Sequence, residues 1–263
     1  MLNSNEVPGI AENIRALLPP SLRHIDLRSF LSIPSTNSYL ISLAESGEPG
    51  ETAVVSKSQT AGRGRLGRSF YSPDSGLYIS VLIRPDIPPE KAALLTPYTA
   101  VAVSEALEKI SGKQTAVKWV NDILIDEKKV CGILTESRSC GPDLKYAVVG
   151  IGVNLYTPVS GFPEDIKNSA GTLFPKNSDG LFENCAAEII RCFFSGLGNF
   201  SSETVFEKYK QKCITLKKNV SFYKNGEKIT AFAEDIDRNF GLKVRLSDGS
   251  CLSVSSGEIS IKL

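Results

Sequence analysis

Hydrophobic residues along the chain follow two spacings, one typical of strands and one typical of helices. Alternating or nearly continuous apolar runs predict strands at 24–33, 52–58, 77–85, 115–120, 123–126, 128–138 and 144–155. Apolar residues spaced three and four apart predict helices after Ser35 or Thr36, over 88–110 with a kink or break at Pro97, over 181–200 and over 203–213. Short turns separate the last four strands, so we expect antiparallel pairing there, because parallel pairing needs long crossovers.

The order of these elements predicts an α+β domain with a mixed, mostly antiparallel central sheet and flanking helices, over residues 25–214. Residues 1–24 are mixed in character and are expected to form a short arm. The stretch 157–180 is rich in Gly, Pro, Ser and Asn and is expected to be a loop. Short strands and the turn signals Asn225-Gly226 and Asp248-Gly249 predict a small C-terminal β-barrel over 215–263.

Charge, cysteine content and the lack of long apolar segments indicate which classes of protein are excluded. The 263 residues are 41% hydrophobic and carry 30 Lys and Arg against 29 Asp and Glu, so any basic character must be local. Six cysteines are scattered without a C-x-x-C pair, which favours reduced thiols over a disulfide framework or a zinc site. No stretch resembles a signal peptide or a membrane span, and we therefore expect a cytoplasmic protein that does not bind membranes.

The most basic local feature is the stretch "SQTAGRGRLGRSF" at 58–70. Three glycines have the G-x-G-x-x-G spacing, with arginines between and after them: Gly62, Arg63, Gly64, Arg65, Gly67 and Arg68. A dinucleotide fingerprint requires a helix directly after the glycines, whereas the next ordered run here has a strand pattern. The kinase and P-loop motifs are absent as well. What remains is a long loop between two strands.

Such a loop can fold over an anion. Glycines let backbone N–H groups approach closely, and arginines supply charged, fork-shaped donors. Ordering the loop costs roughly 1 to 2 kcal/mol per residue, and each charge-assisted hydrogen bond returns about 1.5 to 3 kcal/mol. We therefore expect the loop to be open without a ligand and to close over a charged one. The alternatives are a solvated, flexible basic loop and a basic loop that touches nucleic acid.

A second candidate stretch is "KWVNDILIDEKKVCGI" at 118–133, which reads as a strand, a turn and a second strand. It contains Lys118 and Lys129, each of which could bind a phosphate or a carboxylate. Asn121 and Asp122 lie near the turn, close to both lysines. Composition alone favours the alternative, a hairpin with exposed lysines and a core tryptophan. His24 is the single histidine, which argues against histidine-based catalysis and against a histidine metal cluster; no protein metal site is expected.

In sequence order, "STN", "SQTAGRGRLGR", "SPDSGLYISVLIRP", "KWVNDILIDEKKVCGILTE", "GIGVNL" and a C-terminal "GEIS" resemble the biotin protein ligase family. The resemblance runs from about residue 25 to the C-terminus. It implies a catalytic domain of the biotin-lipoate ligase fold, similar to class II aminoacyl-tRNA synthetases, and an SH3-like C-terminal barrel. It also implies ATP with Mg²⁺, biotin as substrate, and a biotin carboxyl carrier protein of acetyl-CoA carboxylase as acceptor.

The resemblance also implies roles by position. Biotin would be bound by Ser35, Thr36, Asn37, Gln59, Gly62, Arg63, Gly64, Arg65, Lys129 and Gly132. ATP and the adenylate would be bound by Arg65, Arg68, Phe70, Lys118, Trp119, Asn121, Lys129, Gly150, Gly152 and Asn154. The catalytic residues would be Arg65 on the mixed anhydride, Lys129 on biotin and phosphate, and Asp122 orienting or deprotonating the acceptor lysine.

Two positions depart from the family pattern: Val120 replaces a proline and Phe70 replaces a tryptophan. The 24 residues before the domain are too few for a winged helix, so we expect no DNA-binding function. The family includes monomers and homodimers, and the sequence does not decide between them. The rival functions are a lipoate or octanoate protein ligase, with related chemistry, and a non-enzymatic nucleic-acid-binding protein.

Overall fold

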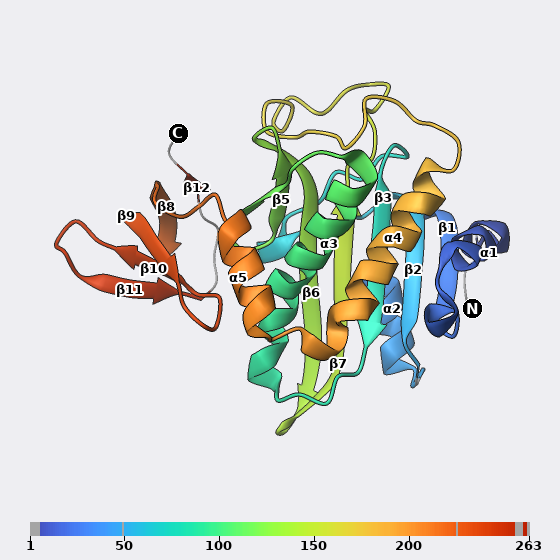
Figure 1. Ribbon diagram of the computed structural model, residues 1–263, viewed down its shortest axis with the longest axis horizontal. Helices are drawn as coiled ribbons and strands as arrows, with labels where there is room; N and C mark the ends of the chain where they lie inside the picture. Colours follow the sequence, from blue (N-terminus) through green and yellow to red (C-terminus); the bar gives the residue numbers. More distant parts are fainter. Residues whose placement is uncertain (1–5, 49, 225, 256–259, 262–263) are drawn as a thin grey trace.

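The central element of the protein is a seven-stranded mixed sheet (Figure 1), seen in a computed structural model that describes residues 6–48, 50–224, 226–255 and 260–261. Its order is β1 (Asp26–Ile33), β2 (Thr52–Gln59), β3 (Leu77–Ile83), β7 (Asp143–Val153), β6 (Lys128–Cys140), β5 (Asp122–Ile125) and β4 (Ala116–Lys118). Only the β1–β2 pair is parallel among these neighbours. The predicted mixed, mostly antiparallel sheet is confirmed.

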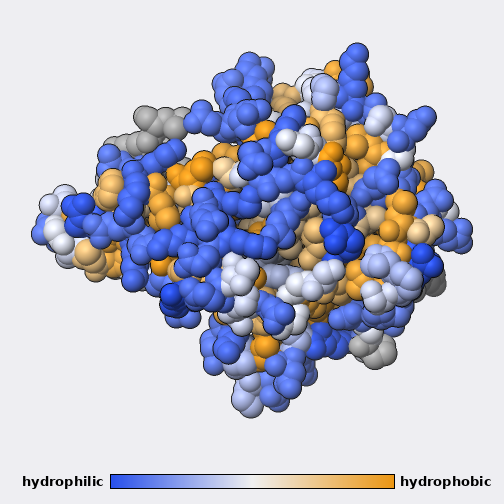
Figure 2. All heavy atoms as spheres, in the orientation of Figure 1, coloured by the Kyte–Doolittle hydropathy of each residue, from blue (hydrophilic) through white to orange (hydrophobic). Residues whose placement is uncertain are grey.

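Helices cover both faces of this sheet. One face carries α3 (Leu95–Ser111), α4 (Leu181–Gly196) and α5 (Glu203–Lys212), and the other carries α2 (Thr36–Glu45) (Figure 1). Short 3-10 turns are η1 (Pro20–Leu22), η2 (Arg65–Gly67), η3 (Pro89–Leu94) and η4 (Leu197–Asn199). The Ser35 hydroxyl caps α2 by accepting from the Ser38 amide, as predicted. Hydrophilic residues gather over α3 and α5 in Figure 2, where Lys208 pairs with Glu105.

Alternation along the strands separates the two faces. On β3, Ile79 and Val81 face the core under the large helices, whereas Leu82 joins a second apolar cluster beneath α2. On β7, Val149 and Ile151 enter the first core, and Val148 enters the second. The α2 face of the sheet is therefore packed only at one end. The other end of that face holds polar residues and glycines.

Two predictions about the helices need correction. Residues 1–24 were expected to form only an arm, but Pro8–Leu17 form α1, whose buried Ala11 and Ile14 pack into the main core. The helix expected over 88–110 is divided into η3 and α3, and α3 begins at Leu95. Pro97 therefore lies in the first turn of α3, where its missing N–H removes no helical hydrogen bond.

The C-terminal part forms a five-stranded antiparallel sheet, in the order β11 (Cys251–Val254), β10 (Leu242–Arg245), β9 (Glu227–Ile236), β8 (Asn219–Lys224) and β12 (Ser260–Ile261). Gly226 and Gly249 have φ of 83° and 84° in the predicted tight turns. Asn225, and most of the "GEIS" stretch, lie outside the described residues. The closure of this sheet into a barrel, and the predicted boundary at 215, stay predictions.

The two sheets meet at the turn after β4. Trp119 is 3% exposed, and its indole Nε1 donates to the Phe240 carbonyl at 2.8 Å. The Tyr209 hydroxyl of α5 donates to the Val120 carbonyl at 3.1 Å, and its ring packs edge-on against Phe240. The peptide bond between Trp119 and Val120 is cis. The hydrogen bonds of Trp119 and Val120 with the C-terminal part and α5 hold in place the turn that leads to Asn121 and Asp122.

Candidate active site

A pocket opens on the α2 face of the sheet, at the end that α2 leaves uncovered. Polar and charged side chains form much of its lining: Ser35, Thr36, Asn37, Gln59, Arg63, Arg65, Arg68, Ser69, Lys118, Asn121, Asp122 and Lys129. Glycines and apolar or aromatic residues complete it: Gly64, Leu66, Phe70, Tyr78, Ile79, Trp119, Gly132, Ile133, Leu134, Gly150, Ile151 and Gly152. The candidate residues from distant parts of the sequence therefore meet at one place.

The loop between β2 and β3, residues 60–76, covers the pocket, and we call it the lid. It is held in a tight fold by the Gly64 amide, which donates to the Arg68 carbonyl at 2.7 Å, and by the Phe70 amide, which donates to the Gly62 carbonyl at 2.9 Å. The lid joins two strands, as expected, and no helix follows its glycines. Leu66, at the lid tip, has φ of 55° and is 73% exposed. Opening of the lid without a ligand stays a prediction.

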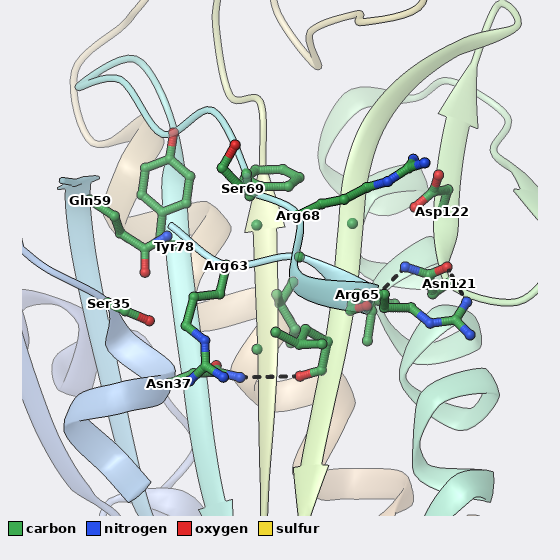
Figure 3. Close-up of a pocket in the computed structure, with 18 of the residues that line it drawn as sticks. Ser35, Asn37, Gln59, Arg63, Arg65, Arg68, Ser69, Tyr78, Asn121 and Asp122 are labelled. Carbon is green, nitrogen blue, oxygen red and sulfur yellow. Dashed lines mark hydrogen bonds between the residues drawn. The ribbon is translucent and has the colours of Figure 1, made fainter. Parts of the chain in front are cut away.

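The lid arginines point in different directions (Figure 3). Arg63 points toward Asn37, and Arg65 donates through Nη1 to the Asn121 Oδ1 at 3.0 Å. Arg68 extends toward Asp122. The lid therefore spreads cationic groups along the length of the pocket.

Glycines on β6 and β7 make room for the lid. Gly132 and Gly152 are paired across the two strands, and Phe70 lies over them. A Cβ at Gly152 would lie 2.7 Å from the Phe70 ring, and one at Gly132 would lie 3.0 Å from it. At Gly150 a Cβ would lie 2.2 Å from the Asn37 Oδ1. The close approach at these glycines is therefore made by side chains and not by another backbone.

The polar end of the pocket is a connected hydrogen-bond network at the start of α2. The backbone amide and hydroxyl of Thr36 donate to the Gln59 Oε1 at 2.9 and 3.1 Å. Ser80 lies within 2.6 Å of both the Thr36 hydroxyl and the Asn37 Oδ1. Thr36, Asn37 and Ser80 are at most 4% exposed, so their orientations are fixed by these partners. This polar end of the pocket can therefore donate hydrogen bonds to, and accept them from, a small polar ring of a ligand.

The other end of the pocket carries the hairpin of β5 and β6. The Lys129 Nζ lies 2.7 Å from the Asp122 Oδ1 and 5.5 Å from the centre of the Phe70 ring. Asn121 donates through Nδ2 to the Ile133 carbonyl, which orients its Oδ1 toward Arg65. Lys118 lies opposite Asp122 in the register of β4 and β5. Five cations thus line the pocket against the single carboxylate of Asp122 among its lining residues.

Two predicted site residues do not line the pocket. Asn154 donates through Nδ2 to the carbonyls of Lys129 and Gly171, at 3.2 and 2.9 Å, and so ties the Lys129 backbone to the loop after β7. A Cβ at Gly62 would lie 2.4 Å from the Phe70 carbonyl and from the Ser72 Oγ, so this glycine permits the lid fold. Both residues support the pocket from behind rather than facing its interior.

Tyr78 and Cys131 are ionisable groups near the pocket, and burial favours the neutral form of both. Burial raises the pKa of Tyr78 well above its usual range, so its hydroxyl stays protonated and donates to the Pro73 carbonyl. Burial likewise raises the pKa of the Cys131 thiol, so it is not a nucleophile. No group of three His, Cys, Asp or Glu side chains suited to a metal occurs within the described ranges. Among the described helices, none has the length and apolarity to cross a membrane.

Sequence reasoning missed part of the site. Seven lining residues had not been expected: Leu66, Ser69, Tyr78, Ile79, Ile133, Leu134 and Ile151. It also missed Ser80 and Glu136, which contact the lining residue Asn37. Period-two alternation places Ser80 on the same face as Leu82, and Glu136 on the same face as Gly132, so the signal was present once the strand register was known.

Comparison with known proteins shows what this chain is similar to. Residues 29–154 match the model of the Biotin/lipoate A/B protein ligase family. The bifunctional ligase/repressor BirA of Bacillus spizizenii is 42% identical over 163 residues, which are 61% of this chain and 50% of that protein. The biotin--[acetyl-CoA-carboxylase] ligase of Paracoccus denitrificans is 40% identical over 123 residues, 46% of this chain and 51% of that protein. The chain spans about half the length of these two relatives.

A solved structure extends the similarity to most of the chain. The biotin protein ligase from Aquifex aeolicus in complex with biotin and ATP has a TM-score of 0.71 and 29% sequence identity, covering 90% of this chain and 98% of that one. The predicted α+β fold is confirmed by this similarity and by the sheet order described above.

Proposed function

Because residues 29–154 match the model of the Biotin/lipoate A/B protein ligase family, we propose that the protein is a biotin protein ligase, which joins biotin to a lysine of a carboxyl carrier domain with the use of ATP. The observation that supports this most strongly is the convergence of five cations on one pocket: Arg63, Arg65, Arg68, Lys118 and Lys129. The polar end at Thr36 and Asn37 suits the ureido ring of biotin. The cationic end suits a carboxylate beside a triphosphate.

In the first step, a biotin carboxylate oxygen attacks the α-phosphorus of ATP, and the bond to pyrophosphate breaks. Both reactants are anions and repel each other, so the site must hold them together and offset their charge. Lys129 and Arg65 both line the pocket, and in our proposal the biotin carboxylate meets the α-phosphate beside them. Lys118 and Arg68 lie on the pyrophosphate side. No base is required, because the nucleophile is already ionised.

In the second step, the amine of the acceptor lysine attacks the biotinyl carbonyl, an amide forms, and AMP leaves. The attacking amine must lose a proton. Asp122 is the lining carboxylate, and its Oδ1 already faces the ammonium of Lys129 at 2.7 Å. We assign to Asp122 the orientation of the incoming amine and the acceptance of its proton.

Magnesium is expected to arrive with ATP. Mg²⁺ in nucleotide sites is commonly held by the phosphates, water and one or two carboxylates. The described part of the chain has no cluster of three metal-binding side chains, and Asp122 is the lining carboxylate able to supply one ligand. These residues fit a MgATP complex rather than a resident metal. When bound, the ion neutralises phosphate charge; orientation of biotin and closure of the lid are left to the protein.

A single assay tests the proposal. Pyrophosphate release from MgATP is measured with biotin, with lipoate and with neither, and AMP release is measured after addition of a biotin carboxyl carrier domain. A biotin ligase releases pyrophosphate with biotin only. It then transfers the biotinyl group to one lysine of the carrier and releases AMP. Release with lipoate instead of biotin would identify a lipoate ligase. No release with either would contradict ligase activity, leaving tight binding to nucleic acid as the function to examine.

A further inference from the structure

Glu136 of β6 contacts both the lid and the floor of the pocket, although it does not line it. Its Oε1 accepts from the Nη2 of Arg63 at 2.6 Å, and its Oε2 accepts from the Nδ2 of Asn37 at 2.9 Å. One carboxylate therefore joins a lid residue to a floor residue. We propose that Glu136 is a positioning residue that fixes the biotin-binding amide of Asn37 and holds the lid closed over it, an inference that rests on the proposed function.

The contact with Asn37 determines the direction of the amide. A carboxylate accepts hydrogen bonds and donates none, so the amino group of Asn37 must face Glu136. The Asn37 Oδ1 then faces Ser80, whose hydroxyl lies at 2.6 Å. Because Asn37 is 4% exposed, water does not replace a lost partner. Without Glu136, the amide loses its strongest acceptor and can reverse.

The contact with Arg63 gives the lid a second attachment. At its far end the lid is attached through Ser72, whose Oγ accepts from the Gln59 Nε2 at 3.2 Å. At its near end Arg63 donates to Glu136, and more weakly to the Ser38 hydroxyl at 3.3 Å. Glu136 is 23% exposed in its side chain, so this charge-assisted pair is partly shielded from solvent. The pair therefore favours the closed lid.

These two contacts make the lid and the floor one unit. Biotin binding at the floor needs Asn37 in the orientation that Glu136 imposes, and the same carboxylate keeps Arg63 over the pocket. The nucleotide end, formed by Lys118 and Asn121, lies on β4 and the turn after it and has no contact with Glu136 among the described interactions. Lid residues Arg65 and Arg68 also reach the nucleotide end, so a change at Glu136 should weaken biotin binding more than it raises the KM for ATP.

Four proteins test the inference: the wild type, Glu136→Gln, Arg63→Met and the double variant. Biotin binding is measured by titration calorimetry and the KM for ATP by pyrophosphate release. We expect Glu136→Gln to weaken biotin binding about tenfold or more, the scale of a lost hydrogen bond to a charged group, with a smaller change in the KM for ATP. The effects of the two single changes should be less than additive in the double variant.

The matched control is Glu108→Gln. Glu108 is 22% exposed and pairs with Lys212 on α3 and α5, so it has similar burial and an ion pair away from the pocket. Glu108→Gln is expected to leave biotin binding unchanged. Equal losses in both variants, or strictly additive effects of Glu136→Gln and Arg63→Met, would overturn the coupling.

A readout without substrate separates this inference from the proposed function. Amide hydrogen exchange across lid residues 62–70 should be faster in Glu136→Gln than in the wild type, and unchanged in Glu108→Gln. Unchanged lid exchange in Glu136→Gln would overturn the lid attachment. If the wild type binds no biotin, the proposed function fails, and the exchange result still decides whether Glu136 holds the lid.

Discussion

The Lys129 ammonium and the Asp122 carboxylate form an ion pair, with 2.7 Å between Nζ and Oδ1, across the hairpin of β5 and β6. Phe70 of the lid lies against the same lysine, and Asn154 holds its backbone carbonyl. Lys129 is thus fixed by a charge, an aromatic ring and a backbone contact. In the proposed mechanism, this pair supplies the cation for the first half-reaction and the base for the second.

Lys129→Ala should abolish most adenylate formation. The cation at the meeting point of carboxylate and phosphate is removed, and the loss of one such electrostatic group commonly costs about 100- to 1000-fold in rate. Biotin-dependent pyrophosphate release measures this directly. Lys128→Ala, at the neighbouring exposed position, is the control and should retain nearly full activity. Unchanged release in Lys129→Ala would exclude the proposed role.

Asp122→Asn should separate the half-reactions. Asparagine keeps the size of the side chain and an oxygen but does not take a proton from the acceptor amine, and general base catalysis contributes about 100- to 10,000-fold. We expect slow transfer from adenylate formed in advance to a carrier domain, with a smaller loss in pyrophosphate release. The residual transfer should increase with pH, because more of the amine is then unprotonated. Equal losses in both steps would contradict a base at this position.

Much of the fold was predictable because local patterns agree with the final structure. The strands of β4 to β7 have strong apolar runs and short turns, so their antiparallel pairing follows from the sequence. Helix α1 was missed because its apolar face is short and is stabilised by packing of Ile14 against the rest of the core. Tertiary contacts of that kind are not visible in a local window.

The candidate site was predictable as a set of residues, but its internal contacts were not. Phe70 over Gly132 and Gly152 depends on how the lid folds back across two strands, and the sequence separation between lid and floor gives no local signal. Glu136 shows the same limit, since its partners lie 73 and 99 positions away in the chain. Such pairings follow only from the register of the sheet.

Gly150→Ala should abolish biotin binding. The new Cβ would lie 2.2 Å from the Asn37 Oδ1, so Asn37 must leave its position next to Ser80. Overpacking of this kind costs about 1 to 3 kcal/mol of stability. Titration with biotin and chemical denaturation measure the two effects. Gly198→Ala is the matched control, because the added Cβ would meet no heavy atom within 4 Å beyond its chain neighbours, and the φ of Gly198 is not positive. Normal biotin binding by Gly150→Ala would contradict the assigned role of Asn37.

Trp119→Phe should destabilise the junction between the two sheets. The indole donates to the Phe240 carbonyl at 2.8 Å in a buried position, and loss of the donor leaves that carbonyl unsatisfied. The expected decrease in the free energy of unfolding is about 1 to 3 kcal/mol, measured by circular dichroism in urea. Tyr223→Phe, at a side chain that is 71% exposed, should change stability by less than about 0.5 kcal/mol. A neutral Trp119→Phe would show that the hydrogen bond adds nothing to folding.

Glu188 on α4 should make stability depend on acid pH. Hydrogen bonds from Arg191 and Lys109, opposed by burial, lower the pKa of its carboxyl from 4.5 to about 2. Because the folded-state pKa lies below the unfolded value, the stabilisation is complete above about 4.5 and is lost as pH falls toward about 2. Glu188→Gln should therefore reduce the free energy of unfolding by about 1 to 3 kcal/mol at neutral pH, with a difference that shrinks in acid. Urea unfolding at several pH values measures this, with Glu164→Gln as control, since Glu164 is 87% exposed in its pair with Lys167 and should contribute little. A difference that stays constant across the acid range would show that Glu188 acts through packing rather than through its charge, because only the ionised carboxylate gains from Arg191 and Lys109.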